Sequence, residues 1–95
     1  MLVNKEEKDG IIECLYKSSN IIASEYDEKN KKLSVTFNYG VKYEYYDVIH
    51  RDYVRFEINE SQGTILNKNL KKYEFKKIGT VDVTPMKEKL KELLG

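Results

Sequence analysis

The sequence predicts an α+β domain in which a three-stranded antiparallel sheet is followed by two short helices packed on one face and by an additional C-terminal helix. Three observations support this fold class. Runs rich in β-branched and aromatic residues alternate with polar turns between residues 20 and 48. Apolar residues then recur at helical spacing from residue 49 to residue 73, and again from residue 85 to residue 94.

The middle strand is the best defined of the three, which are predicted over IIASEYD, LSVTFNYG and VKYEYYDV. In it, Leu33, Val35 and Phe37 fall on one face, and Ser34 and Thr36 fall on the other. Alternation with a period of two is typical of a half-buried strand. This strand is therefore expected to turn its apolar residues toward the core.

The hairpin between the second and third strands is expected to have a three-residue loop with Gly40 in the left-handed conformation. This loop pairs Val35 with Tyr43 and Leu33 with Tyr45. A two-residue loop would instead turn two charged residues toward the core, where burial without partners is costly. The three-residue loop therefore fits the sequence better.

Two helices are predicted between the sheet and residue 73. The first is indicated by the spacing of Ile49, Tyr53 and Phe56, whose side chains would cover the sheet. The second begins near Ser61 or Thr64, either of which can cap a helix. Its apolar positions at helical spacing are Leu66, Leu70 and Tyr73.

The two flanks of this region are less regular. The polar stretch from Asn4 to Gly10 is left unassigned, because it fits either a frayed end or one poor helical turn. Residues 75–81 are expected to lead to the last helix, with a short strand as one option. A C-terminal helix is predicted over residues 85–94, since a Thr-Pro pair starts it and an apolar stripe follows.

Length and charge limit the classes of function. The chain has 95 residues, which suits one domain over residues 1–95. Its net charge of +1 gives no overall attraction to nucleic acid or an anionic membrane. No segment resembles a signal peptide or a membrane span, and the lone Cys14 excludes an intramolecular disulfide. We expect a cytoplasmic protein, in the host cytoplasm if it is phage-encoded, without a membrane partner.

An ordered series of residues between positions 16 and 73 resembles a known family. The series is Ser18, Ser19, Asn20, Ile21, Tyr26, Asp27, Leu33, Val35, Phe37, Gly40, Tyr43, Glu44, Tyr45, Val48, Ser61, Gly63, Asn67, Leu70 and Tyr73. In order and spacing it is similar to the KTSC domain, a short module of bacterial and phage proteins that also ends some lysyl-tRNA synthetases. That family usually has Pro where this chain has Ile49, so the entry to the first helix is expected to differ. The resemblance implies a KTSC-like core over residues 16–73 and, through the synthetases, RNA binding.

Tyrosines of the third strand are the first candidate ligand-binding residues. Tyr43 and Tyr45 lie on one face, as rings that stack on bases would. Alternatively, both are core aromatics facing the apolar side of the middle strand. Tyr39 at the turn and Tyr46 on the opposite face are further options for an exposed ring.

The segment Ser18, Ser19 and Asn20 is the second candidate. Its hydroxyls and amide could bind a phosphate or a base edge. Alternatively, these side chains satisfy the backbone of a turn that precedes the first strand.

The start of the second helix is the third candidate. Ser61 and Gly63 lie where free N–H groups favour an anion, and Asn67 and Lys71 follow on the same element. The alternative is a helix cap followed by a solvated basic face. The segment lacks the full phosphate-loop pattern, so nucleotide hydrolysis has no support.

Catalysis is the least supported class of function. His50 and Cys14 have no triad spacing, and a single His and a single Cys do not form a zinc-ligand cluster. We therefore expect structural roles for both residues, with no catalytic residue, no metal and no cofactor.

Two hypotheses about function follow. The first is a small non-catalytic binding module for a nucleotide-type ligand, either RNA or, in a phage, a small signalling nucleotide that the protein sequesters. The second is a self-assembling protein interaction domain, because a three-stranded sheet leaves free edges and the C-terminal apolar stripe could pair with another copy. A homo-oligomer is compatible with both hypotheses.

Overall fold

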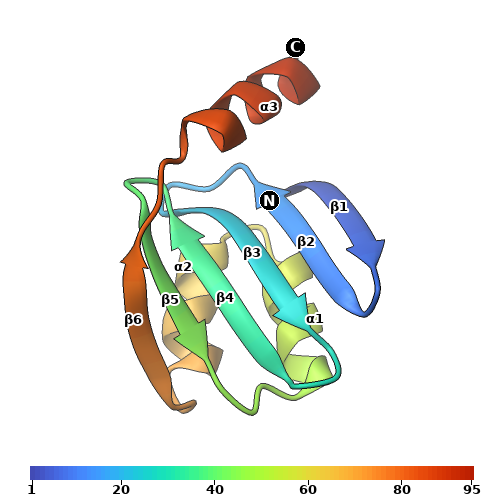
Figure 1. Cartoon of the computed structure of the whole chain (residues 1–95), viewed down its shortest axis with the longest axis vertical. Coiled ribbons are helices and arrows are strands. Elements are labelled where there is room, and N and C mark those ends of the chain that lie inside the picture. Colours follow the sequence, from blue (N-terminus) through green and yellow to red (C-terminus); the bar gives the residue numbers. More distant parts are fainter.

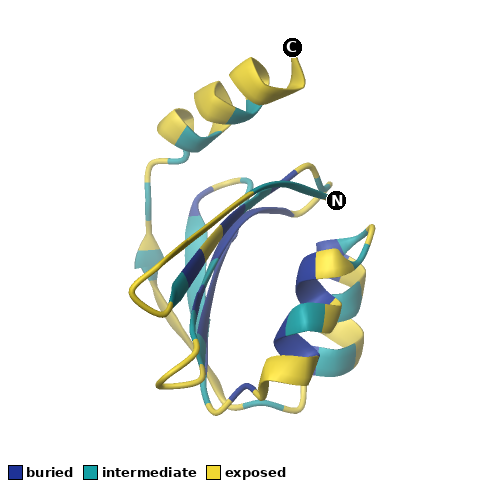
Figure 2. Cartoon of the chain, turned by 90° about the vertical axis from the view of Figure 1, so that its right-hand side faces the viewer, coloured by how far each residue is buried: buried dark blue, intermediate teal, exposed yellow.

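The computed structural model describes residues 1–95, and in it six antiparallel strands form one sheet in chain order (Figure 1). The strands are β1 (Leu2–Lys8), β2 (Ile11–Tyr16), β3 (Ile21–Asp27), β4 (Lys32–Phe37), β5 (Val41–Tyr45) and β6 (Phe75–Thr80). The helices are α1 (His50–Ile58), α2 (Gln62–Ile65), the π-helical segment η1 (Leu66–Leu70) and α3 (Thr84–Leu94). Helix α1 lies on one side of the sheet and α3 lies beyond the other side (Figure 2). We call the face covered by α1, α2 and η1 the inner face, and the opposite face the outer face.

The expectation of three strands was wrong, because β1, β2 and β6 extend the predicted meander on both sides. β1 and β2 pair around a turn at Asp9 and Gly10, whose φ angles are 54° and 80°. Positive φ at both central residues is typical of a type I′ turn, one of the two favoured turns of two-residue hairpins. The edge strands β1 and β6 are largely exposed, so they lack the apolar alternation that marks a half-buried strand.

The predicted register of the β4–β5 hairpin is confirmed. Val35 pairs with Tyr43 and Leu33 pairs with Tyr45. Gly40 has a φ of 102°, so it occupies the left-handed region as expected. The helices α1 and α3 are also confirmed, and the second predicted helix is a short α-helix that continues as a π-helix.

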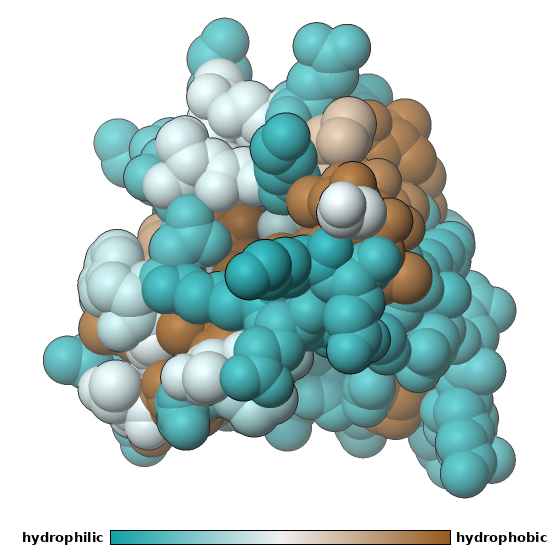
Figure 3. All heavy atoms as spheres, turned by 90° about the horizontal axis from the view of Figure 1, so that it is seen from above, coloured by the Kyte–Doolittle hydropathy of each residue, from teal (hydrophilic) through white to brown (hydrophobic).

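The C-terminal helix α3 packs lightly on the outer side, near β1, β2 and β3. Met86 and Leu90 are half-buried, whereas Leu93 and Leu94 are about half exposed. Viewed from the α3 end, the surface is mainly hydrophilic, with hydrophobic atoms visible between the polar side chains (Figure 3). None of the helices has the length and apolar composition required to span a bilayer.

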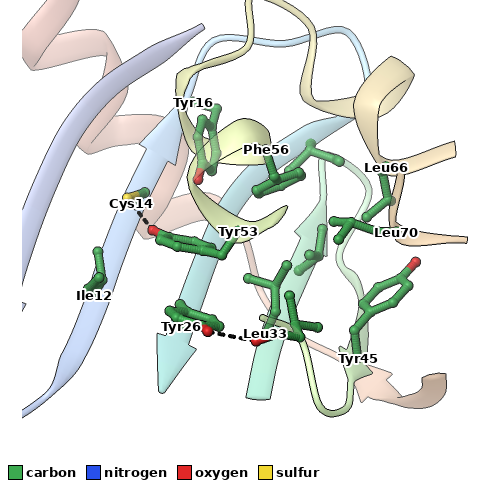
Figure 4. Close-up of a cluster of buried hydrophobic side chains, with 13 residues drawn as sticks. Ile12, Cys14, Tyr16, Tyr26, Leu33, Tyr45, Tyr53, Phe56, Leu66 and Leu70 are labelled. Carbon is green, nitrogen blue, oxygen red and sulfur yellow. Dashed lines mark hydrogen bonds between the residues drawn. The ribbon is translucent and has the colours of Figure 1, made fainter. Parts of the chain in front are cut away.

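The core lies between the inner face and the helices (Figure 4). The ring of Tyr53 stacks on Tyr26, with centroids 4.1 Å apart, and Phe56 meets Tyr16 edge-on at 5.5 Å. The hydroxyl of Tyr26 donates to the carbonyl of Val48 at 2.7 Å, so this buried phenol is satisfied. Aromatic side chains therefore join α1 to β2 and β3.

A buried polar network crosses the same interface. The hydroxyl of Tyr53 donates to Glu57 Oε1 at 2.8 Å, and Cys14 Sγ lies 3.5 Å from that hydroxyl. Lys5 of β1 reaches the Glu57 carboxylate at 3.2 Å. Burial raises the pKa values of the Cys14 thiol and the Tyr53 phenol above their ordinary ranges. Burial therefore disfavours the thiolate, which is the reactive form of a cysteine.

A second buried acid, in α1, contacts the residues that follow η1. Asp52 accepts a hydrogen bond from the Tyr73 hydroxyl at 2.5 Å, and Lys72 Nζ lies 3.0 Å from the same carboxylate oxygen. The hydrogen bond from Tyr73, together with the charge of Lys72, holds the pKa of Asp52 below its ordinary value. The carboxylate form is therefore the one that stabilises the fold.

Asp52→Asn is expected to lower the free energy of unfolding by about 1–3 kcal/mol at neutral pH, because a charged hydrogen-bond acceptor is lost. Since the pKa is lower in the folded chain than in the unfolded chain, this stabilisation is present above the unfolded pKa of 3.8 and disappears as the pH falls through the folded pKa. Urea unfolding of both proteins should therefore give a difference that narrows below about pH 4. A difference that stays constant down to pH 2 would show that charge is not involved.

Candidate functional site

Two of the predicted candidate segments meet at one corner of the molecule. The side chain of Asn20, just before β3, lies against Gly63 in α2: a Cβ atom added at Gly63 would be 2.6 Å from Asn20 Nδ2 and 3.2 Å from Asn20 Cβ. Glycine is therefore the residue that permits this close approach. We call the surface formed by Ser18, Ser19, Asn20, Ser61 and Gly63 the corner.

The amino-terminal group also lies at the corner. The Met1 ammonium donates to the carbonyls of Lys17 and Glu60, each at 2.9 Å, and to Gln62 Oε1 at 2.6 Å. Partial burial lowers the pKa of this ammonium. A shallow depression is lined by Met1, Lys17, Ser18, Ser19, Glu60 and Ser61. Sequence reasoning missed this contribution, because no local pattern places the start of the chain beside α2.

The polar groups of the first segment are only partly used within the protein. Ser18 Oγ accepts from the Asn20 backbone N–H at 3.4 Å, as the turn interpretation predicts. Asn38 fixes the segment further, because its side chain donates to the Ser18 carbonyl and its N–H donates to the Asn20 carbonyl. The side chains of Ser19 and Asn20 are exposed and have no hydrogen-bond partner in the protein. They are therefore free to contact a ligand.

At the start of α2, the hydroxyl of Ser61 already has a hydrogen-bond partner within the protein. Ser61 Oγ lies 2.9 Å from Thr64 Oγ1, and it makes no capping hydrogen bond to the backbone. Asn67 and Lys71 are exposed along the following helical segment, with no side-chain hydrogen bond or ion pair. They lie on the same element as Gly63, but no contact joins either of them to the corner.

A row of five aromatic rings crosses the β4, β5 and β6 side of the inner face. Tyr39 stacks near Phe37 with centroids 5.7 Å apart, and Phe37 meets Tyr43 edge-on at 5.6 Å. Phe75 then lies 6.0 Å from Tyr43 and 5.4 Å from Tyr45. We call this row the aromatic ladder. It begins beside the corner, since Tyr39 follows directly after the Asn38 that anchors Ser18 and Asn20.

The burial of the ladder residues shows which of the predicted tyrosines, Tyr43 and Tyr45, are core aromatics and which rings are accessible to a ligand. Tyr45 is buried in the core, 7% exposed, so its ring is a core aromatic. Tyr43 is half-buried and packs against the same core. The accessible rings are instead Tyr39, which is 70% exposed, and Phe75, which is 53% exposed. Phe75 was missed because β6 was not firmly predicted, and the pairing of β6 with β5 is what brings it to the ladder.

One lysine of β6 lies beside the ladder in the sheet. Lys77 pairs with Tyr43 across β5 and β6, whereas Lys76 pairs with Glu44 on the opposite face. Lys72 is held by Asp52, whereas Lys77 forms no ion pair. No group of three or more His, Cys, Asp or Glu residues is placed to hold a metal ion. The surface therefore offers exposed rings, neutral hydrogen-bonding groups and cationic side chains.

Comparisons with known proteins show that the part of the chain that carries the corner and the ladder matches a protein family. Residues 17–75 match the model of the KTSC domain. The crystal structure of a KTSC domain protein from Yersinia pestis is similar, with 28% sequence identity and a TM-score of 0.67, and the alignment covers 73% of this chain and 99% of that one. No match is found among curated proteins. The family match contains the corner and the whole aromatic ladder, and it leaves out β1, β2, β6 beyond Phe75, and α3.

Proposed function

The chain belongs to the KTSC domain family, and from that premise we propose that it is a small non-catalytic binding module for a nucleotide-type ligand. The observation that carries the proposal is the meeting of Asn20 and Gly63 at a corner that adjoins the exposed ring of Tyr39. Ring stacking and amide hydrogen bonds are the contacts that recognise a nucleobase. In this proposal the ligand lies across the corner and the exposed end of the ladder.

Each part of the surface has a proposed role. Tyr39 stacks on a base, with Phe75 available for a second one, while Ser19 and Asn20 contact a base edge or a phosphate. Lys77 and Lys71 supply positive charge for phosphates. Buried Tyr45 supports the ladder from the core and does not touch the ligand.

Two ligand sizes fit this proposal, namely RNA and a small signalling nucleotide that a phage protein would sequester. A net charge of +1 favours the compact ligand, because binding of a long polyanion draws most of its affinity from many cationic contacts. The dependence of binding on salt separates these two cases.

Self-assembly is the second candidate function. The edge strands β1 and β6 each leave one side unpaired, and Phe75, Ile78, Leu93 and Leu94 are exposed hydrophobic residues near the β6 edge or on α3. A measurement of mass in solution tests this alternative directly.

A thermal-shift screen is the experiment that tests the nucleotide proposal. The purified protein is heated with short RNA, single-stranded DNA, mononucleotides and cyclic di- or trinucleotides at two salt concentrations. A ligand that binds the folded state raises the Tm by mass action. We expect one compact nucleotide to do so at both salt concentrations.

Tyr39→Ala should then weaken binding by about 1–3 kcal/mol, or about 5- to 150-fold in Kd, if the ring stacks on a base. Titration calorimetry with the nucleotide from the screen measures the change. Tyr46→Ala is the matched control, since Tyr46 lies outside the ladder and its hydroxyl donates to Glu44. Equal affinity of both variants, or no Tm shift with any nucleotide, would refute the proposal.

A further inference from the structure

A cavity of about 320 Å³ lies on the outer face, between the sheet and α3. It is separate from the corner and the ladder, because the residues Glu13, Glu25, Ser34 and Thr36 that line it alternate along their strands with residues that face the core. Met86 of α3 contributes to its roof. Its floor comes from five adjacent strands, β1 to β5, and includes Glu13, Glu25, Ser34, Thr36 and Lys42.

Two hydroxyl groups carried by largely buried residues face this cavity. Ser34 is 7% exposed and Thr36 is 3% exposed, yet neither side chain has a hydrogen-bond partner in the protein. They alternate with Leu33 and Val35, which point into the core, so their hydroxyls point to the outer face. No fully enclosed side-chain oxygen or nitrogen lacks a partner, so both hydroxyls reach the cavity space. These accessible hydroxyls can therefore donate to and accept from an occupant of the cavity.

Two glutamates beside these hydroxyls are placed unfavourably for an empty cavity. Glu13 and Glu25 lie directly opposite each other across β2 and β3, and neither has an ion pair or hydrogen bond. Like charges at directly opposed positions destabilise a sheet. Glu6 continues the row on β1, but it is neutralised by Lys89 of α3 at 3.3 Å. A cation between Glu13 and Glu25 would remove the repulsion.

The end of the floor at β5 carries a positive charge. Lys42 pairs with Thr36 across β4 and β5, and it forms no ion pair. Two strand spacings, or about 10 Å, separate β3 from β5. The floor thus runs from two carboxylates, through two hydroxyls, to one ammonium group.

We propose that this cavity binds a small amino-acid-like zwitterion. Its ammonium group lies between Glu13 and Glu25, its carboxylate lies at Lys42, and the hydroxyls of Ser34 and Thr36 bind the polar groups between these ends. Half-buried Met86 contacts the apolar carbons from above. The geometry favours an organic cation over a metal ion, since no set of three acidic, His or Cys side chains is placed to coordinate one.

Titration of the isotope-labelled protein with ω-amino acids tests the proposal. The probes are 4-aminobutanoate, 5-aminopentanoate and 6-aminohexanoate, with pentylamine and pentanoate as ligands that each lack one charge. We expect amide chemical shifts to change at residues of the cavity floor, with at least one zwitterion binding more tightly than both single-charge compounds. No shift with any ω-amino acid at millimolar concentration, or equal binding of pentylamine, would overturn the proposal.

Substitutions of the two glutamates test ligand affinity and stability separately. Glu13→Gln combined with Glu25→Gln is expected to weaken zwitterion binding about 10- to 100-fold, because charge-assisted hydrogen bonds are lost. The same variant should have a higher Tm than the unchanged protein without ligand, since the opposed charges are removed. Glu88→Gln, on an exposed part of α3 outside the cavity, is the matched control and should leave both quantities unchanged. Unchanged affinity in the double variant would place the ligand elsewhere.

Discussion

Replacing Phe56 with alanine is expected to lower the free energy of unfolding by about 3–5 kcal/mol, the largest effect of any substitution considered for this chain. Phe56 is fully buried, and its ring meets Tyr16 of β2 edge-on. Removing it leaves a cavity where α1 packs on the sheet and also removes an aromatic pair. Small domains have little stability in reserve, so urea denaturation should show a much earlier midpoint.

Ile58→Ala is the control for this prediction, because Ile58 belongs to the same helix but is 68% exposed. A surface substitution of this kind should change stability by no more than about 0.5 kcal/mol. If the two variants were equally stable, α1 would not be packed on the sheet as described.

Gly40→Ala is expected to destabilise the fold by about 2–4 kcal/mol, combining backbone strain with a steric clash. Gly40 has a φ of 102°, and an added Cβ would lie 2.6 Å from the carbonyl oxygen of Val81. The Val81 N–H also donates to the Gly40 carbonyl at 2.8 Å. The clash therefore disturbs the contact that directs the chain from β6 toward α3. Thermal unfolding should show a lower Tm for Gly40→Ala, and the amide of Val81 should exchange faster with solvent.

Gly10→Ala separates backbone strain from steric clash in the destabilisation expected for Gly40→Ala. Gly10 also has a positive φ, 80°, but nothing lies within 4 Å of the added Cβ. Its substitution should cost only the backbone term, about 1–2 kcal/mol. Equal losses in the two variants would show that the approach of Val81 to Gly40 contributes nothing to stability.

The Gly40 contact also connects the fold to the proposed outer-face site. Helix α3 is attached to the sheet through Val81, the ion pair of Lys89 with Glu6, and the half-buried residues Met86 and Leu90. Its packing is light, so the position of the cavity roof depends on these few contacts. Weakening the contact between Gly40 and Val81 is therefore expected to weaken binding in the cavity.

The sequence by itself determined the centre of this protein. Alternation of Leu33 and Val35 with Ser34 and Thr36 fixed which side of β4 faces the core, and the need to keep charges out of that core fixed the register with β5. Helical spacing likewise identified α1 and α3. These features are local, because each depends on a periodicity within one segment or on one turn.

The polar strands and the sites were decided only by the tertiary structure. β1 and β6 carry no apolar alternation, and they form because β2 and β5 offer them backbone partners. The Asp9–Gly10 turn was the one local signal for the first hairpin. Asn20 meets Gly63, and Phe75 joins Tyr39 through the ladder, because segments distant in sequence pack or pair together. Such juxtapositions depend on the folding of the whole chain, so no single stretch of sequence encodes them.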